Sequence, residues 1–98
     1  MISQQQKDII QQILAPFEPE RIGIFGSVAR GDAGPNSDLD ILVRFTKRYS
    51  LFDLVDMNDL LEEALQCKID LVTENSLHPA IKPYVEKDLI LIKDAKRS

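Results

Sequence analysis

The sequence has one cysteine, no excess of positive charge and no apolar run long enough to cross a membrane. Cys67 cannot form an internal disulfide and stands apart from the ligands that a zinc site needs, so we expect it to fill apolar space. With 12 Lys and Arg against 16 Asp and Glu, the net charge is −4, which disfavours a long nucleic acid as partner.

The sequence also lacks membrane and export signals. Its apolar runs fall short of the roughly 20 residues of a membrane-spanning helix, so no membrane contact is expected. The stretch from Met1 to Gln6 has neither the basic flank nor the apolar segment of a signal peptide. We therefore predict a cytoplasmic location.

Length and composition predict one compact domain over residues 1–98. A chain of 98 residues leaves no length for a second domain that could recognise a substrate. Its 44% hydrophobic and 29% charged residues are typical of ordinary folded proteins and argue against disorder.

Apolar periodicity predicts helices and strands in alternation. Ser3 and Gln6 have the spacing of a capping box and begin a first helix, which Pro16 ends. A short helix is expected directly after the first strand. The expected strands are Arg21–Phe25, 38–45, Ile69–Thr73 and, at an edge of the sheet, Leu89–Ile92.

Two further helices are expected in the second half of the chain. Ser50 and Asp53 have the spacing of a helix cap, and the wide apolar face that follows should cover one face of the sheet. The residues of this face are Leu51, Leu54, Val55, Met57, Leu60, Leu61, Ala64 and Leu65. Pro79 suits the first turn of a short helix with the apolar positions Ile81, Tyr84 and Val85. The fold class is therefore α/β (α+β), with helices packed on a small mixed sheet.

The most informative segment joins a glycine turn to a pair of aspartates. It reads Gly26-Ser27-Val28-Ala29-Arg30-Gly31, followed by Ser37-Asp38-Leu39-Asp40. A strand that ends at Gly26 and Ser27 and turns into a helix presents free backbone N–H groups and a small hydroxyl to a triphosphate. No Gly-Lys-Ser/Thr follows, so this is not a Walker A loop, and a kinase or ATPase loses its main support.

The side chains beside this turn have more than one interpretation. Arg30 can pair with phosphate oxygens, or it can brace the turn through Asp32 or another carboxylate. Asn36 and Ser37 are expected to shape the turn that delivers Asp38, and the Ser37 hydroxyl can also orient that carboxylate.

Asp38 and Asp40 lie two residues apart on a predicted strand, so their carboxylates leave the same face with Cα atoms about 6.7 Å apart. Nucleotidyl transfer by two metal ions needs carboxylates that bridge ions about 3.5 to 4 Å apart. Oxygen ligands of this kind select magnesium, with manganese as the alternative, over zinc. We therefore predict two bound Mg²⁺ ions.

A third carboxylate must come from a neighbouring strand. Asp70 is the only acidic residue inside a later apolar strand pattern, although a lone aspartate on a strand can also be an exposed edge residue. Without a cation, three converging carboxylates would repel by about 4 kcal/mol per close pair. The predicted cluster of Asp38, Asp40 and Asp70 therefore indicates bound metal. The next candidates for the third position are Asp53, Asp56 and Glu74.

The pattern from Gly26 to Asp40, G-S-x-x-R-G followed by S-D-x-D, resembles the signature of polymerase-beta-like nucleotidyltransferases. It is closest to the minimal, or MNT, group that is often paired with HEPN-domain toxins, and with Asp70 it spans residues 22–72. The resemblance implies the polymerase-beta-like fold. It also implies that the acidic residue at the place of Asp70 helps to hold the catalytic metal and accepts the acceptor's proton. The implied catalytic and metal-binding residues are Asp38, Asp40 and Asp70, and the implied nucleotide-binding residues are Gly26, Ser27, Arg30 and Ser37.

Larger relatives in this superfamily add a domain that recognises the acceptor, and this chain has no room for one. The resemblance therefore implies an antitoxin that forms a hetero-oligomer with a HEPN ribonuclease. It would transfer AMP from ATP, or a nucleotide from another nucleoside triphosphate, to a tyrosine of that partner. The alternative is a binding module that masks the partner while its nucleotide site is vestigial. The enzyme is favoured because all five key residues are intact, namely Gly26, Ser27, Asp38, Asp40 and Asp70.

Two other positions are weaker candidates for function. His78 precedes Pro79 at a predicted helix start, where a cap or an exposed position is expected. Lys47, Arg48 and Tyr49 follow the second strand, where a solvated loop is favoured over contact with the nucleotide or the acceptor.

Overall fold

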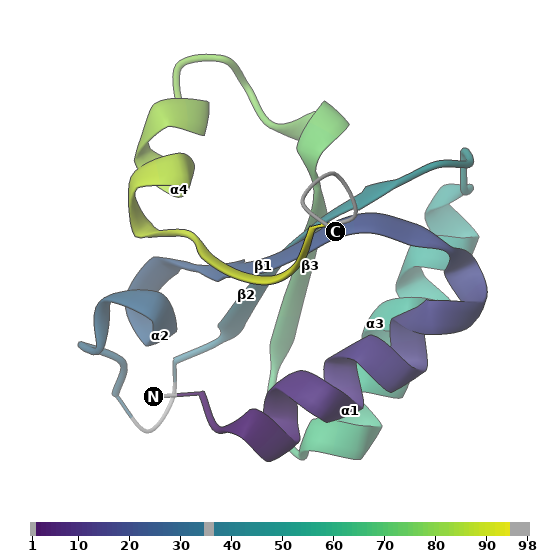
Figure 1. Cartoon of the computed structure of the whole chain (residues 1–98), viewed down its shortest axis with the longest axis horizontal. Helices are drawn as coiled ribbons and strands as arrows, with labels where there is room; N and C mark the ends of the chain where they lie inside the picture. Colours follow the sequence, from purple (N-terminus) through teal and green to yellow (C-terminus); the bar gives the residue numbers. More distant parts are fainter. Residues whose placement is uncertain (1, 35–36, 95–98) are drawn as a thin grey trace.

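The computed structural model describes residues 2–34 and 37–94, which form a four-stranded mixed sheet with helices on both faces (Figure 1). The inner strand β1 (Pro19–Phe25) pairs antiparallel with β2 (Leu39–Phe45) and with β4 (Ile90–Asp94). On its other side, β2 pairs parallel with β3 (Ile69–Thr73). The order β3-β2-β1-β4 confirms the predicted mixed sheet and places the last strand at an edge.

Two long helices cover one face of the sheet and form the core with it (Figure 1). α1 (Gln4–Leu14) and α3 (Leu51–Leu65) each begin with a capping box, at Ser3 and at Ser50, as the sequence predicted. A 3-10 turn, η1 (Ala15–Phe17), follows α1. The buried core residues are Ile10, Leu14, Ile22, Ile24, Leu39, Ile41, Val43, Met57, Leu61 and Ile69. No helix in the described part of the chain is long and apolar enough to span a membrane.

The apolar face predicted for α3 is wider than the face that packs on the sheet. Met57 and Leu61 are fully buried, but the exposed fractions of Leu51, Val55 and Leu60 are 74%, 50% and 47%. The prediction of one sheet-covering face was therefore too broad. The apolar residues of α3 extend around more of the helix than the stripe that contacts the core.

Cys67 is exposed, so the prediction that it fills apolar space was wrong. α3 ends at Leu65, and Gln66 adopts a left-handed conformation with a φ of 56°. This residue turns the chain out of the helix before Cys67. The cysteine thus lies in a connection, where no helix or strand period directs its side chain inward.

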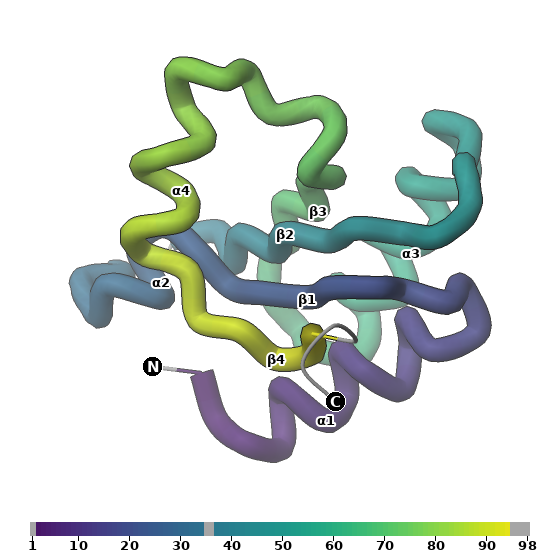
Figure 2. Tube along the Cα trace, turned by 45° about the horizontal axis from the view of Figure 1, so that its top comes forward, coloured from purple at the N-terminus to yellow at the C-terminus, as the bar shows by residue number. Residues whose placement is uncertain are grey.

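The opposite face of the sheet is covered in part by α2 (Gly26–Arg30) and α4 (Lys82–Asp88) (Figures 1 and 2). Pro83, and not Pro79 as predicted, lies in the first turn of α4, because the chain makes a separate turn before this helix starts. Val85 is the buried residue of α4. The last helix is therefore short and contributes little to the core.

A buried carboxylate on this face links a 3-10 turn to two strands by ion pairs. Glu74 begins the 3-10 turn η2 (Glu74–Ser76) and is only 8% exposed. It pairs with Arg21 of β1 at 2.6 Å and with Arg44 of β2 at 3.3 Å. Arg21 also pairs with Glu86 of α4 at 3.2 Å. Because a buried carboxylate needs such partners, the network fixes the end of β3 and the helix α4 to the sheet.

Candidate active site

Two of the predicted carboxylates lie side by side on adjacent strands. Asp40 of β2 and Asp70 of β3 are register partners in the parallel pair, and paired strands lie about 4.8 Å apart. Ile41 and Ile69 belong to the core, so their neighbours Asp40 and Asp70 project from the opposite face. Asp38 directly precedes the first residue of β2. The three predicted residues thus lie at the start of the two parallel strands, with Asp40 and Asp70 as direct neighbours.

The three carboxylates differ in exposure and influence one another. Asp38 and Asp70 are exposed, whereas Asp40 is half-buried. Burial raises the pKa of Asp40, the charges of Asp70 and Asp38 raise it further, and only Arg30 opposes this shift. The ionised form of Asp40 is therefore less favourable in the folded protein than in the unfolded chain, and a bound cation would relieve this cost.

The oxygen donors at this end of the sheet fit a divalent cation by their chemistry. Carboxylates bind Mg²⁺ or Mn²⁺, usually as one or two side chains that share the ion with substrate phosphates. Across residues 2–34 and 37–94, no three His, Cys, Asp or Glu side chains converge closely enough to hold an ion unaided. The predicted convergence of three carboxylates on a metal is therefore not seen there. Further ligands of an ion at Asp40 would come from a bound phosphate group.

Gly26 brings the start of α2 against Asp40. Its φ of 76° is a left-handed conformation that side chains rarely adopt, and a Cβ at this position would collide with Oδ2 of Asp40. The approach follows from the strand pairing, because Phe25 is the register partner of Asp40. Ser27 comes next in the first turn of α2 and is half-buried. The glycine turn and the carboxylates therefore belong to one site.

Arg30 braces α2 in this structure. Its guanidinium pairs with Asp32 at 3.2 Å and with Asp88, the last residue of α4, at 2.9 Å. The hydrogen bond to Asp88 is the main reason that the pKa of Arg30 is raised. The bracing interpretation is therefore observed, whereas contact of Arg30 with a phosphate stays a prediction.

Ser37 closes the turn that leads to Asp38. Its hydroxyl accepts a hydrogen bond from the Gly34 N–H at 2.9 Å, and its own N–H donates to the Gly34 carbonyl at 3.1 Å. These two hydrogen bonds between Gly34 and Ser37 agree with the predicted turn role of Ser37, and its contact with a nucleotide stays a prediction. Asn36, which was expected to help shape this turn, lies outside the described residues.

The other acidic candidates for the third carboxylate have different surroundings. Asp53 caps α3 through the backbone N–H of Ser50, and Glu74 is held by arginines. Asp56 is exposed on α3. None of these three contributes to the pKa shift of Asp40, whereas Asp70 does. Asp70 therefore remains the residue best placed to act with Asp40.

The weaker candidates have local structural contacts. His78 is exposed, and its Nδ1 accepts a hydrogen bond at 3.1 Å from the backbone N–H two residues later. Lys47 pairs with Glu18 at 2.9 Å, and the Tyr49 hydroxyl donates to the Phe17 carbonyl at 2.6 Å. His78 is exposed as predicted, but it lies before a turn and not at a helix start, because α4 begins at Lys82. The contacts of Lys47 and Tyr49 agree with the predicted loop after β2.

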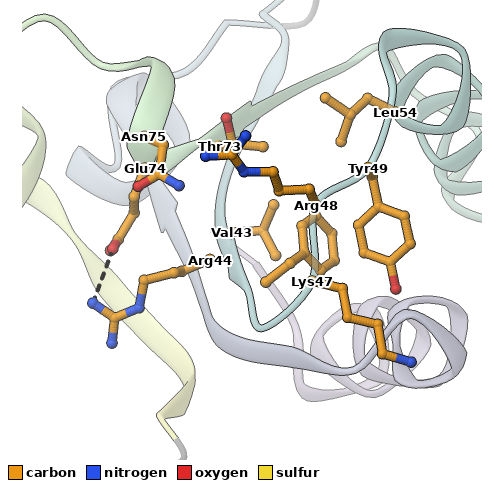
Figure 3. Close-up of a pocket in the computed structure, with 10 residues that line it drawn as sticks. Val43, Arg44, Lys47, Arg48, Tyr49, Leu54, Thr73, Glu74 and Asn75 are labelled. Carbon is orange, nitrogen blue, oxygen red and sulfur yellow. Dashed lines mark ion pairs between the residues drawn. The ribbon is translucent and has the colours of Figure 1, made fainter.

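A cavity of about 210 Å³ lies at the other end of the sheet (Figure 3). Its lining residues are Val43, Arg44, Phe45, Lys47, Arg48, Tyr49, Leu54, Thr73, Glu74 and Asn75. Phe45 lies five residues beyond Asp40 on β2, a distance of about 16 Å along a strand. None of the implied catalytic, metal-binding or nucleotide-binding residues lines this cavity, although the weaker candidates Lys47, Arg48, Tyr49 and Glu74 do. Its volume is therefore no evidence for the nucleotide site.

Comparison with known proteins defines the family. Residues 4–92 match the model of the nucleotidyltransferase domain. Over 76 residues the chain is 37% identical to the protein adenylyltransferase MntA of Thermococcus cleftensis. The match covers 78% of this chain and 77% of that protein. It is also 37% identical over 83 residues to the protein MJ0126 of Methanocaldococcus jannaschii. This match covers 84% of this chain and 85% of that protein. The chain belongs to the nucleotidyltransferase domain family, as the motif predicted.

Solved structures have the same fold. A chain of a toxin–antitoxin crystal structure with AMP-PNP matches with a TM-score of 0.83 at 22% identity, over 93% of this chain and 75% of that chain. Another match is in the structure of a tri-AMPylated Shewanella oneidensis HEPN toxin in complex with MNT antitoxin. There the TM-score is 0.79 at 19% identity, over 98% of this chain and 76% of that chain. These likenesses confirm the predicted α+β fold.

Gly26→Ala is expected to lower the affinity for MgATP at least tenfold, or about 1.4 kcal/mol, because the added Cβ displaces the Asp40 carboxylate. Gly31→Ala is the matched control. Its φ of 82° gives a similar backbone cost of about 1–2 kcal/mol, but nothing lies within 4 Å of its Cβ. Titration calorimetry with MgATP and melting curves of both variants measure affinity and stability. Equal affinities of the two variants would contradict a role for the contact between Gly26 and Asp40.

Proposed function

We propose that this nucleotidyltransferase transfers AMP from ATP to a HEPN-domain partner and thereby acts as its antitoxin. The observation that carries the proposal is the register of Asp40 and Asp70 beside the left-handed Gly26 turn. The relative MntA is named a protein adenylyltransferase. The fold neighbours come from a toxin–antitoxin structure with AMP-PNP and from a complex of an AMPylated HEPN toxin with MNT antitoxin. The name of this relative and the contents of these neighbouring structures support a HEPN partner and an adenine nucleotide for this chain.

In the proposed reaction, a tyrosine hydroxyl of the partner attacks the α-phosphorus of ATP. A bond forms between that oxygen and the phosphorus, the bond to the bridging oxygen of the β-phosphate breaks, and pyrophosphate leaves. Asp70 accepts the proton of the hydroxyl, and its exposure lets it reach an acceptor that is presented from outside. Asp38 and Asp40 would hold magnesium together with the triphosphate, and a bound ion would supply positive charge for the oxygens at the reacting phosphorus.

The nucleotide would be held by the turn beside these carboxylates. Gly26 and Ser27 offer backbone N–H groups and a hydroxyl to the triphosphate, as expected where a strand turns into a helix. Arg30 keeps α2 against α4 and adds positive charge next to Asp40. Ser37 fixes the turn from which Asp38 projects. In this proposal these four residues position the triphosphate relative to the acceptor hydroxyl.

The proposal is tested by incubating the purified protein with labelled ATP, Mg²⁺ and the product of the adjacent gene, followed by intact mass measurement. We expect the partner to gain one or more AMP units and EDTA to abolish this gain. Saturating MgATP should also raise the melting temperature of the free chain. At a MgATP concentration of 100 times Kd, the free energy of unfolding should rise by about 2.7 kcal/mol. A partner that binds but gains no mass would instead support the binding module with a vestigial site.

A further inference from the structure

The first half of α3 borders an apolar groove that the fold leaves uncovered. Leu51 and Val55 lie one helical turn apart and are 74% and 50% exposed. Together with Leu54, and with Leu71 and Thr73 of β3, they line a groove of about 330 Å³ between the helix and the edge strand. Phe52, Leu60, Ile81 and Tyr84 are also exposed but do not line this groove. Apolar side chains gathered around a groove are typical of an interaction site.

The neighbouring edge of β3 is closed to another strand. The Asn58 side chain accepts a hydrogen bond from the Leu71 N–H at 3.2 Å, and the Glu62 carboxylate accepts one from the Ile69 N–H at 3.1 Å. An extended segment that added to β3 would find these backbone donors occupied. A helix satisfies its own backbone and binds through side chains alone. The groove therefore suits a helix and not a strand.

The charge on α3 defines the kind of helix that fits. The helix carries five acidic residues and no basic one, and the acidic residues are Asp53, Asp56, Asp59, Glu62 and Glu63. Asp56 and Asp59 are exposed. Asp59 follows Val55 by one helical turn and so borders the groove with an acidic rim, which an occupant with Lys or Arg beside its apolar face complements. A second copy of this chain would instead bring the same acidic rim against itself, which is unfavourable.

We propose that the groove formed by Leu51, Leu54, Val55 and Leu71 binds an amphipathic helix of the protein partner whose apolar face is flanked by Lys or Arg. The inference rests on the proposed function, which supplies the partner. β3 is the edge strand of the sheet, and Asp70 directly precedes Leu71 on it. A partner held in the groove therefore lies next to the strand that carries Asp70, whose carboxylate projects from the other face of the sheet at this edge. The groove thus recognises the substrate protein through the nucleotidyltransferase domain itself.

Partner binding in the absence of nucleotide tests the groove separately from catalysis. The probe is the product of the adjacent gene, which the proposed function expects to be the HEPN-domain partner, and its Kd is measured by calorimetry. Val55→Glu should weaken binding at least tenfold, because it puts a charge into the apolar groove. Leu60→Glu is the matched control on the same helix, since Leu60 is 47% exposed and lies outside the groove. It should change Kd less than twofold.

Two further measurements address the rim and the reaction. Asp56→Lys combined with Asp59→Lys should weaken binding at least threefold at low salt and less at high salt. In the transfer assay, Val55→Glu should raise KM for the partner while kcat and the MgATP affinity of the free chain stay unchanged. The proposal would be overturned if folded Val55→Glu bound the partner with wild-type affinity. It would also be overturned if the variant with Asp56→Lys and Asp59→Lys bound the partner more tightly than the wild type. If Val55→Glu weakens partner binding but the wild type transfers no AMP, the proposed function is overturned and the role of the groove in binding is supported.

Discussion

Replacing both Asp38 and Asp40 by asparagine is expected to lower AMP transfer to the partner at least a thousandfold, or about 4 kcal/mol in activation free energy. The amides preserve the shape of β2 but remove the charges that would hold Mg²⁺ between the strand and the triphosphate. Labelled AMP on the partner, measured at saturating MgATP, gives the rate. A double variant that modifies the partner at the wild-type rate would rule out this assignment.

The same double variant should be more stable than the wild type when no metal is present. The pKa of Asp40 is raised above its ordinary value of 3.8, so the folded state binds its proton more readily than the unfolded chain does. Ionised Asp40 therefore destabilises the fold above the raised pKa, and this cost is absent below the ordinary one. Melting curves in EDTA should show the gain at neutral pH and lose it as the pH falls toward 3.8.

Asp70→Asn is expected to lower transfer at least a hundredfold while MgATP affinity stays within roughly tenfold, or about 1.4 kcal/mol. Asp70 would accept the proton of the attacking hydroxyl, whereas Asp38, Asp40 and the Gly26 turn remain to hold the nucleotide. Single-turnover transfer and calorimetry with MgATP separate the two effects.

The control for Asp70→Asn is Asp8→Asn, a change of equal chemistry at an exposed position on α1. This control should transfer AMP normally. If Asp70→Asn also transfers normally, the third carboxylate lies elsewhere. If it abolishes MgATP binding, Asp70 is a metal ligand or a structural residue and not the base.

The strands and caps were predictable because their signals are local. Alternation over 38–45 fixed the core face of β2, and the Ser3 and Ser50 capping boxes marked the two long helices. The exposed side of α3 was not predictable, because its apolar residues match both a core face and a binding face. The direction of Cys67 depends on the left-handed conformation of Gln66, which no local pattern requires.

The members of the site were predictable, but their contacts were not. The motif identified Gly26, Asp38 and Asp40, and a search for acidic residues in later strands found Asp70. Its register opposite Asp40 depends on how two parallel strands far apart in sequence align, which single-strand patterns do not specify. The pairing of Arg30 with Asp88 likewise requires α4 to fold back over the sheet.

The parallel pairing of β2 with β3 makes α3 the crossover between the two strands that carry Asp40 and Asp70. The element that borders the apolar groove is thus covalently continuous with both carboxylate-bearing strands. If a partner on α3 favours one spacing of these strands, it changes the affinity of the site for the nucleotide and its metal. Linkage then requires MgATP to change partner affinity by the same factor, so recognition and catalysis would share one coupling free energy.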